Sequence, residues 1–265
     1  MYQINIIKMK KLPKNFTTDK VKLLIENYPI KSRIEVEKLF PEYSWRSLQN
    51  ISGFLKLKKE YSEVRRGDLS ILLNNSILSS YWLGLFASDG CITEDCTFKI
   101  DLQLKDKEYL EQLSLYLNTS IKEYPRYDSS KPGGTGTCRV KVRDKLYGKS
   151  IKNIFYKNGL KTYNPINIDF LKNTENFLSF LIGYIDGDGF ISKQGRIVID
   201  GHSNMEVLFT DIINKLKKID NNFNLSLTKY QQMIRINFNT ECSAYLNTFR
   251  KQQNLPVLKR KWEKS

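Results

Sequence analysis

The stretch LIGYIDGDGF at Leu181–Phe190 begins with apolar and aromatic residues and ends in two carboxylates, Asp186 and Asp188, each followed by glycine. A related stretch, WLGLFASDGCI at Trp82–Ile92, carries a single acid, Asp89, at the position that matches Asp188. Both patterns predict a buried helix in which a small residue recurs four positions on, so that two such helices can approach closely along one face. The small residues are Gly84 and Ser88 in one stretch and Gly183 and Gly187 in the other.

The acids at the ends of these helices need a reason to be there. A helix C-terminus carries partial negative charge and disfavours a carboxylate by a few tenths to about 1 kcal/mol. If the helices pack in parallel, Asp89 and Asp188 also lie side by side and repel each other. A bound divalent cation reverses both penalties, because carboxylates and phosphate oxygens together make a magnesium site. One Asp-Gly pair alone could be a simple turn, but two copies in matching contexts favour a functional role.

Composition points to a polyanionic partner. The 265 residues contain 43 Lys and Arg against 28 Asp and Glu, a net charge of +15. This excess favours nucleic acid over a membrane surface, and no apolar run reaches the 18 residues that a membrane span needs. We see no secretory signal, and four irregularly spaced cysteines with one histidine make a zinc site unlikely. We therefore expect an intracellular protein, in a bacterial or phage-infected cytoplasm or an organelle.

The chain from residue 79 onward repeats itself. Asp89 and Asp188 are 99 positions apart, and each is followed by the same order of elements. The predicted fold class is α+β, with two pseudo-symmetric αββαββα halves, paired motif helices at their interface and antiparallel sheets. In each half the first strand of each pair has the weakest strand pattern, and Gly159 is the expected end of the last helix of the first half. The predicted domains are a helical module at 1–60, a linker at 61–78, and halves at 79–170 and 171–265.

The N-terminal module reads as three short helices, at 17–28, at 32–40 and from Ser44 onward. This is the pattern of a helix-turn-helix, in which the first turns of the last helix face base edges. Trp45, Arg46 and Gln49 are therefore candidate DNA contacts. The alternative is a plain three-helix bundle with Trp45 in its core.

The strands of the two halves predict DNA-reading surfaces, because alternation separates a core face from a polar face rich in cations and amides. Such side chains pair with base edges, and a β-ribbon fits the major groove. In TFKIDLQL, at 97–104, we expect Phe98, Ile100, Leu102 and Leu104 to face inward and Thr97 outward. A strand of eight residues spans ~27 Å, which is comparable with roughly eight base pairs of duplex. Two sheets of such strands therefore imply a long, asymmetric site of about 20 base pairs. The candidate DNA-binding residues are Lys99, Asp101, Gln103, Arg139, Lys141, Arg143, Arg196, Asn224, Ser226, Thr228, Arg235, Asn237 and Asn239.

LIGYIDGDG and WLGLFASDG resemble the two motifs of LAGLIDADG homing endonucleases in their single-chain form, over roughly Ser79–Ser265. The resemblance implies that the acid at the eighth motif position, here Asp89 and Asp188, binds metal. The sixth position is Asp186 in one motif and Ala87 in the other, which makes Asp186 a weaker candidate.

The same resemblance implies a catalytic basic residue late in each half, and the chain offers Lys161 and Lys261, with Lys259 as a competitor. Ordinary phosphate-facing or solvated lysines are the alternative. The first block of the sequence resembles the Myb/SANT-type helix-turn-helix appended to some mobile-element nucleases.

The sequence as a whole predicts a monomeric homing endonuclease of a mobile element that cleaves double-stranded DNA at a specific site. Asp89 and Asp188 would hold Mg²⁺, as two or three divalent cations that Mn²⁺ can replace, and activate water for hydrolysis of both strands. One alternative is an RNA-binding maturase with intron RNA as its partner. A second is a non-catalytic DNA-binding regulator, and a third is a nicking enzyme that cuts one strand.

Overall fold

The computed structural model describes residues 12–13, 15–29, 31, 33–57, 67–124, 136–156 and 166–263. The chain divides into two compact units, Met1–Arg65 and Arg66–Ser265, which are treated separately below. The predicted helix end at Gly159 and the candidate catalytic Lys161 both lie outside the described residues.

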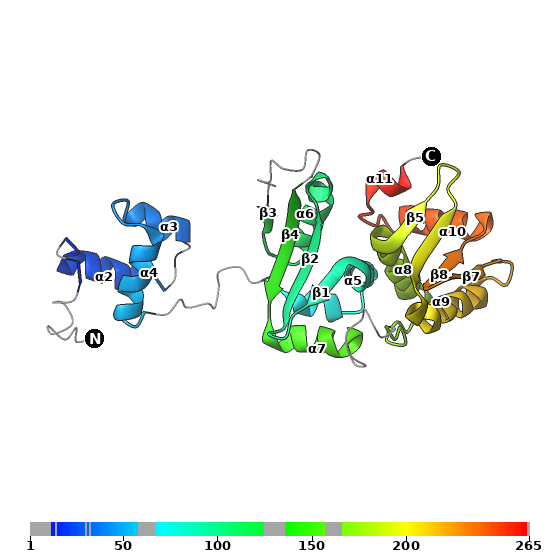
Figure 1. Ribbon diagram of the computed structural model, residues 1–265, viewed down its shortest axis with the longest axis horizontal. Helices are drawn as coiled ribbons and strands as arrows, with labels where there is room; N and C mark the ends of the chain where they lie inside the picture. The colour runs from blue at the N-terminus through cyan, green and yellow to red at the C-terminus, as the bar shows by residue number, and fades with distance from the viewer. Residues whose placement is uncertain are drawn as a thin grey trace. The chain divides into compact units, whose positions relative to one another are not determined.

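The first unit contains the three helices that the sequence predicts: α2 at Thr18–Asn27, α3 at Arg33–Leu39 and α4 at Trp45–Phe54 (Figure 1). Thr17 caps the N-terminus of α2 and Ser44 caps that of α4, and their hydroxyls accept hydrogen bonds from backbone amides of the first turn. The unit has a hydrophobic core of its own, made of Phe16, Val21, Leu24, Tyr28, Val36, Phe40, Leu48 and Ile51.

The second unit consists of two halves with the same order of elements, and each has the predicted αββαββα arrangement (Figure 1). The first half follows a short 3₁₀ helix, η1 (Leu69–Leu73), and comprises α5 (Ile77–Asp89), β1 (Gly90–Ile92), β2 (Thr97–Gln103), η2 (Leu104–Asp106), α6 (Lys107–Tyr116), β3 (Ile121–Tyr124), β4 (Thr137–Arg143) and α7 (Lys145–Phe155). The second half comprises α8 (Thr174–Asp188), β5 (Gly189–Ile191), β6 (Ile197–His202), η3 (Ser203–Met205), α9 (Glu206–Ile219), β7 (Ser226–Tyr230), β8 (Met233–Asn237), α10 (Thr240–Gln252) and α11 (Lys259–Trp262).

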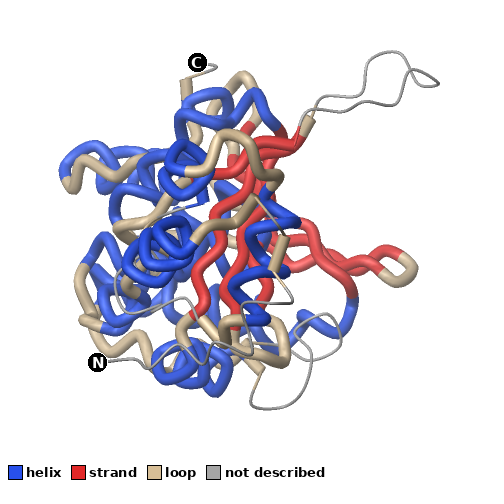
Figure 2. The backbone as a smooth tube through the Cα atoms, turned by 90° about the vertical axis from the view of Figure 1, so that its left-hand side faces the viewer, coloured by secondary structure: helices blue, strands red, loops and turns tan. Residues whose placement is uncertain are grey.

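Each half carries a four-stranded antiparallel sheet, ordered β1-β2-β4-β3 and β5-β6-β8-β7 (red in Figure 2). The strand register is also repeated: Gly90 pairs with Ile100 in one sheet, and Gly189 pairs with Ile199 in the other. Both partners are displaced by the same 99 positions that separate the two motif acids. The sequence duplication therefore corresponds to a structural one.

Side-chain alternation places Phe98 and Ile100 in the core, as expected, and leaves Asp101 exposed. The expected outward position of Thr97 is wrong, because this residue is 2% exposed. The turn before β2 folds over the end of that strand, where the Thr93 amide donates to the Thr97 carbonyl. The same turn packs tightly on α7.

Helices α5 and α8 pack against each other along the predicted seam, the face that carries Gly84 and Ser88 on α5 and Gly183 and Gly187 on α8. A Cβ on Gly84 would lie 1.9 Å from the Phe180 carbonyl oxygen, and a Cβ on Gly183 would lie 1.9 Å from that of Tyr81. Only glycine fits at either place. The contacts run in the same direction along both helices, from Ile77 beside Ser179 to Ser88 beside Gly187, so the helices are parallel, as the clustering of acids requires.

None of the helices within the described ranges is long and apolar enough to cross a membrane.

Candidate active site

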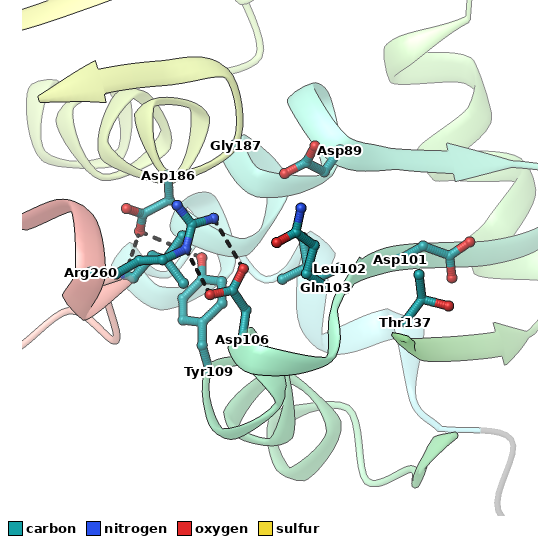
Figure 3. A pocket seen from close by; sticks show the side chains of 11 residues that line it. Asp89, Asp101, Leu102, Gln103, Asp106, Tyr109, Thr137, Asp186, Gly187 and Arg260 are labelled. Atoms are coloured by element: carbon teal, nitrogen blue, oxygen red, sulfur yellow. Dashed lines mark hydrogen bonds and ion pairs between the residues drawn. The ribbon is translucent and has the colours of Figure 1, made fainter. Parts of the chain in front are cut away.

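The two predicted metal-binding acids terminate the paired helices. Asp89 is the last residue of α5 and Asp188 is the last residue of α8. A Cβ on Gly187 would lie 3.0 Å from Asp89 Oδ2, so the end of α8 touches the carboxylate of α5 (Figure 3). Burial raises the pKa of Tyr184, and the charges of Asp188 and Asp89 raise it further. Both carboxylates are thus close enough to Tyr184 to raise the pKa of its hydroxyl.

Lys261 lies at this cluster. Its ammonium group donates hydrogen bonds to the carbonyl oxygens of Ile185 (3.0 Å), Gly187 (2.7 Å) and Gly189 (2.7 Å), at the C-terminal end of α8. Burial lowers the pKa of Lys261, while the charges of three nearby aspartates, Asp186, Asp89 and Asp188, raise it. The structure therefore brings the predicted basic residue of the second half to both predicted acids. Its competitor Lys259 is exposed at the start of α11.

Asp186 points away from this cluster into the protein and is 2% exposed. It accepts hydrogen bonds from the Tyr81 hydroxyl, from Trp262 Nε1 at 2.6 Å and from the Leu258 amide at 3.2 Å. Burial raises the pKa of Asp186 to about 6, although these hydrogen bonds oppose the rise. The side chain fixes the C-terminal segment against both motif helices, which explains why it is the weaker candidate for a metal ligand.

A second polar link joins the C-terminal segment to the first half. Arg260 donates to Asp106 through Nε (2.7 Å) and a terminal nitrogen (3.0 Å), and the Asp106 side chain is only 5% exposed. This pair and Asp89 line one cavity of about 300 Å³ between the halves (Figure 3). Sequence reasoning missed Asp106 and Arg260, because partners 154 residues apart leave no local pattern.

The family comparison fits this geometry. The family model described as LAGLIDADG-like domain matches residues 76–158, from the start of α5 past the end of α7. The second half repeats the topology and register of the matched region outside the matched range.

Solved structures with similarity to the chain include two homing endonucleases and one LAGLIDADG domain. The homing endonuclease I-WcaI bound to its DNA recognition sequence aligns with a TM-score of 0.47 and 16% identity, over 77% of this chain and 89% of that chain. I-DmoI in complex with DNA and Ca aligns with a TM-score of 0.43 and 16% identity, over 66% and 89%. The N-terminal LAGLIDADG domain of DUF199/WhiA aligns with a TM-score of 0.44 and 14% identity, over 70% and 92%. No curated protein sequence matches the chain.

The donors at the C-terminal ends of α5 and α8 fit a hard divalent cation. Asp89 and Asp188 supply carboxylate oxygens, and such oxygens are the ligands that Mg²⁺, Ca²⁺ and Mn²⁺ prefer. Within the described ranges, no group of three or more His, Cys, Asp or Glu residues could hold a metal ion. Two carboxylates would therefore need water or phosphate oxygens to complete the coordination, as expected of a site that shares its metal with a substrate.

The polar faces of the two sheets lie where alternation predicts them. Lys141 and Arg143 are exposed, and Arg139 is partly exposed, next to the buried Val140 and Val142. Asn237 on β8, Arg196 just before β6 and Asn239 just after β8 line a groove of about 790 Å³. The expectation that Asn239 is an outward strand residue is wrong, because this residue caps the N-terminus of α10 and its side chain accepts a hydrogen bond from the Cys242 amide. The other candidate contacts are exposed or partly exposed: Lys99, Asp101, Gln103, Asn224, Ser226, Thr228 and Arg235.

Each sheet also holds an Asp–Arg pair on this face. Asp101 binds Arg139, and Asp200 binds Arg235. Asp101 is among the residues that the sequence predicts to contact DNA, whereas Asp200 is not. The common offset from the motif acids could have revealed it, because 101 − 89 and 200 − 188 are both 12.

In the N-terminal unit, Arg46 and Gln49 are exposed on α4. Trp45 instead stacks on Tyr28, with ring centroids 5.8 Å apart and planes inclined by 20°, and packs against the core of that unit. The structure therefore gives Trp45 the packing role that was the alternative to DNA contact.

Proposed function

We propose that the chain is a metal-dependent, sequence-specific endonuclease of double-stranded DNA, with Asp89 and Asp188 as the metal-binding acids. The observation that carries the proposal is the meeting of two like-charged carboxylates at the C-terminal ends of two parallel helices. This arrangement costs stability unless a cation is bound between the acids and a phosphate.

Different residues of the chain would have different roles in the proposed hydrolysis. A divalent cation held by Asp89 and Asp188 would supply Lewis-acid stabilisation and lower the pKa of a bound water. Lys261 contributes positive charge beside the acids, where negative charge builds up on the phosphate. Lys161 is the proposed counterpart in the first half.

The rest of the unit positions the substrate. The polar faces of the two sheets bind a long, asymmetric duplex, and the net charge of +15 favours its backbone. One chain supplies both acids, so we propose a monomer that acts inside a cell or organelle. The proposed domains are the N-terminal module at residues 1–60, a linker at 61–78 and the two halves at 79–170 and 171–265. Arg46 and Gln49 of the N-terminal module would add DNA contacts to those of the halves.

The test is selection of cleaved ends. The full chain is incubated with Mg²⁺ and a randomised duplex library, and the new DNA ends are sequenced. We expect ends at one long site, absent with EDTA and absent for the Asp89→Asn/Asp188→Asn double variant. Retention of DNA without new ends would contradict the nuclease and favour a regulator. Preferential retention of competing RNA would favour a maturase, and ends on one strand alone would favour a nicking enzyme.

A further inference from the structure

The polar face of each sheet carries one Asp–Arg pair across its two central strands. Asp101 on β2 lies directly opposite Arg139 on β4, and Asp200 on β6 lies directly opposite Arg235 on β8. Both pairs are two-pronged. Arg235 donates to Asp200 through Nε at 2.6 Å and Nη2 at 2.9 Å, and Arg139 donates to Asp101 through Nε and through Nη2 at 2.8 Å.

The two pairs occupy equivalent places. Each aspartate is 12 residues beyond the motif acid of its half, since 101 − 89 and 200 − 188 are equal. The strands around them share one register, because Ile100 pairs with Val140 and Ile199 pairs with Ile236. The two arginines are therefore displaced equally from the acids at the centre of the unit.

Stability does not account for these pairs. The side chains are 32% to 52% exposed, and exposed ion pairs contribute about 0–1 kcal/mol in general. A neutral pair is also a poor device for attracting phosphates, which lone cations such as Lys141 do better. What the carboxylate does is hold the planar guanidinium in one orientation.

That orientation leaves a specific edge of the guanidinium available. The aspartate occupies the edge formed by Nε and Nη2, so the edge formed by Nη1 and the second hydrogen of Nη2 points onward. Two parallel N–H donors on such an edge match O6 and N7 of guanine in the major groove. The ring of Tyr124 lies 4.9 Å from the Arg139 guanidinium and fixes its plane further.

We propose that Arg139 and Arg235 each read one guanine, at matched distances from the centre of the target, with Asp101 and Asp200 as positioning residues. This inference rests on the proposed binding of duplex DNA by the two sheets. Because the halves are related by pseudo-symmetry, the two guanines lie on opposite strands of an otherwise asymmetric site.

The experiment is a binding selection that needs no cleavage. The full chain is mixed with randomised duplex DNA in EDTA, and the retained DNA is sequenced. We expect guanine at two positions equidistant from the centre. Arg139→Met should lose about 5-fold to 150-fold of the guanine preference at one of them alone, and Arg235→Met should do so at the other.

Two further sets of variants separate base reading from other roles. Asp101→Asn and Asp200→Asn should weaken the same preferences several-fold without lowering the affinity for random DNA. The matched control is Arg143→Met, which should lower the affinity for duplex DNA without changing the guanine preference at either position, because Arg143 faces Asp95 at 3.4 Å and makes no two-pronged pair in the described structure.

A loss of affinity that is the same for all sequences in Arg139→Met and Arg235→Met would overturn the inference, as would a selected site without matched guanines. Either result leaves the proposed nuclease intact if the same protein still cleaves that site. Failure to retain any duplex would overturn both.

Discussion

The two halves of the Arg66–Ser265 unit share an order of elements and a strand register, yet they differ at the sixth position of the motif helix. In α5 this position is Ala87, a small side chain buried in the helix interface. In α8 it is Asp186, an equally buried carboxylate that accepts hydrogen bonds from the C-terminal segment. The eighth position is aspartate in both.

This difference separates two uses of an acid within one motif. Asp186 joins Tyr81 of the first half and Trp262 of the last helix, and the same segment places Lys261 on the end of α8. The acid at the sixth position therefore fixes the C-terminal segment from the buried side, whereas Asp188 is exposed at the end of α8. Two carboxylates that are two residues apart have opposite surroundings, which agrees with the proposal that only Asp188 binds metal.

The largest expected effect comes from the glycines that both halves share. Gly84→Ala and Gly183→Ala should each destabilise the second unit by about 3 kcal/mol or more, because the added Cβ meets backbone oxygen. Hydrogen exchange at the amides of α5 and α8 measures this loss of stability, and it should be faster in the variants than in the wild type. Gly53→Ala is the control, since nothing lies within 4 Å of its Cβ, and it should be neutral or stabilising by up to about 1 kcal/mol. Exchange rates equal to those of the wild type in both Gly84→Ala and Gly183→Ala would show that α5 and α8 do not pack closely at these glycines.

Asp186 provides the next largest effect, as a pH dependence. Its folded-state pKa, about 6, lies above the ordinary value of 3.8, because burial disfavours the charge. The stability that it contributes is thus complete below pH 4 and is lost as the pH rises through 6. Relative to Asp186→Asn, the wild type should lose about 2–3 kcal/mol of unfolding free energy between pH 4 and 7, measured by denaturant titration in EDTA. A constant difference across this range would contradict the account.

The contact between α5 and α8 is asymmetric where Ser88 of α5 faces Gly187 of α8. Exchanging these two residues tests whether the halves are interchangeable at this position. A Cβ on Gly187 would lie 1.8 Å from Ser88 Oγ, so Gly187→Ser should cost about 1–3 kcal/mol. The double variant Ser88→Gly/Gly187→Ser removes the obstructing side chain and should return to within about 1 kcal/mol of wild type. Additive losses in the double variant, seen by thermal unfolding, would mean that the two positions do not share one space.

The smallest of these effects concerns the lysine beside the acids. Lys261→Met removes a charged donor from three carbonyl oxygens at the end of α8 and should cost about 1–2 kcal/mol of unfolding free energy. Lys259→Met, an exposed neighbour on the same short helix, should stay within about 0.5 kcal/mol. Equal losses in the two variants would show that the hydrogen bonds to α8 do not stabilise the fold.

The sequence predicts those features that local patterns encode. Small residues four apart in apolar helices predict the α5–α8 seam, period-two alternation predicts the faces of β2 and β4, and the repeated acids predict the helix ends. Features that depend on distant partners were not predictable in this way. Asp186 is held by Trp262, 76 residues away, and Tyr81, 105 residues away, and neither leaves a pattern near the motif. Burial of Thr97 likewise depends on how the turn before β2 packs on α7.

The most direct test of the central claim is strand-resolved cleavage at the selected target in Mg²⁺, comparing Asp89→Asn, Asp188→Asn and Asp186→Asn with the wild type. The account predicts that Asp89→Asn and Asp188→Asn each lose double-strand cleavage by about 1,000-fold or more while still retaining the target DNA. Asp186→Asn, with the acid behind the site neutralised, should continue to cut both strands. Wild-type cleavage by Asp89→Asn or Asp188→Asn, or a loss of DNA binding as large as the loss of cleavage, would contradict it.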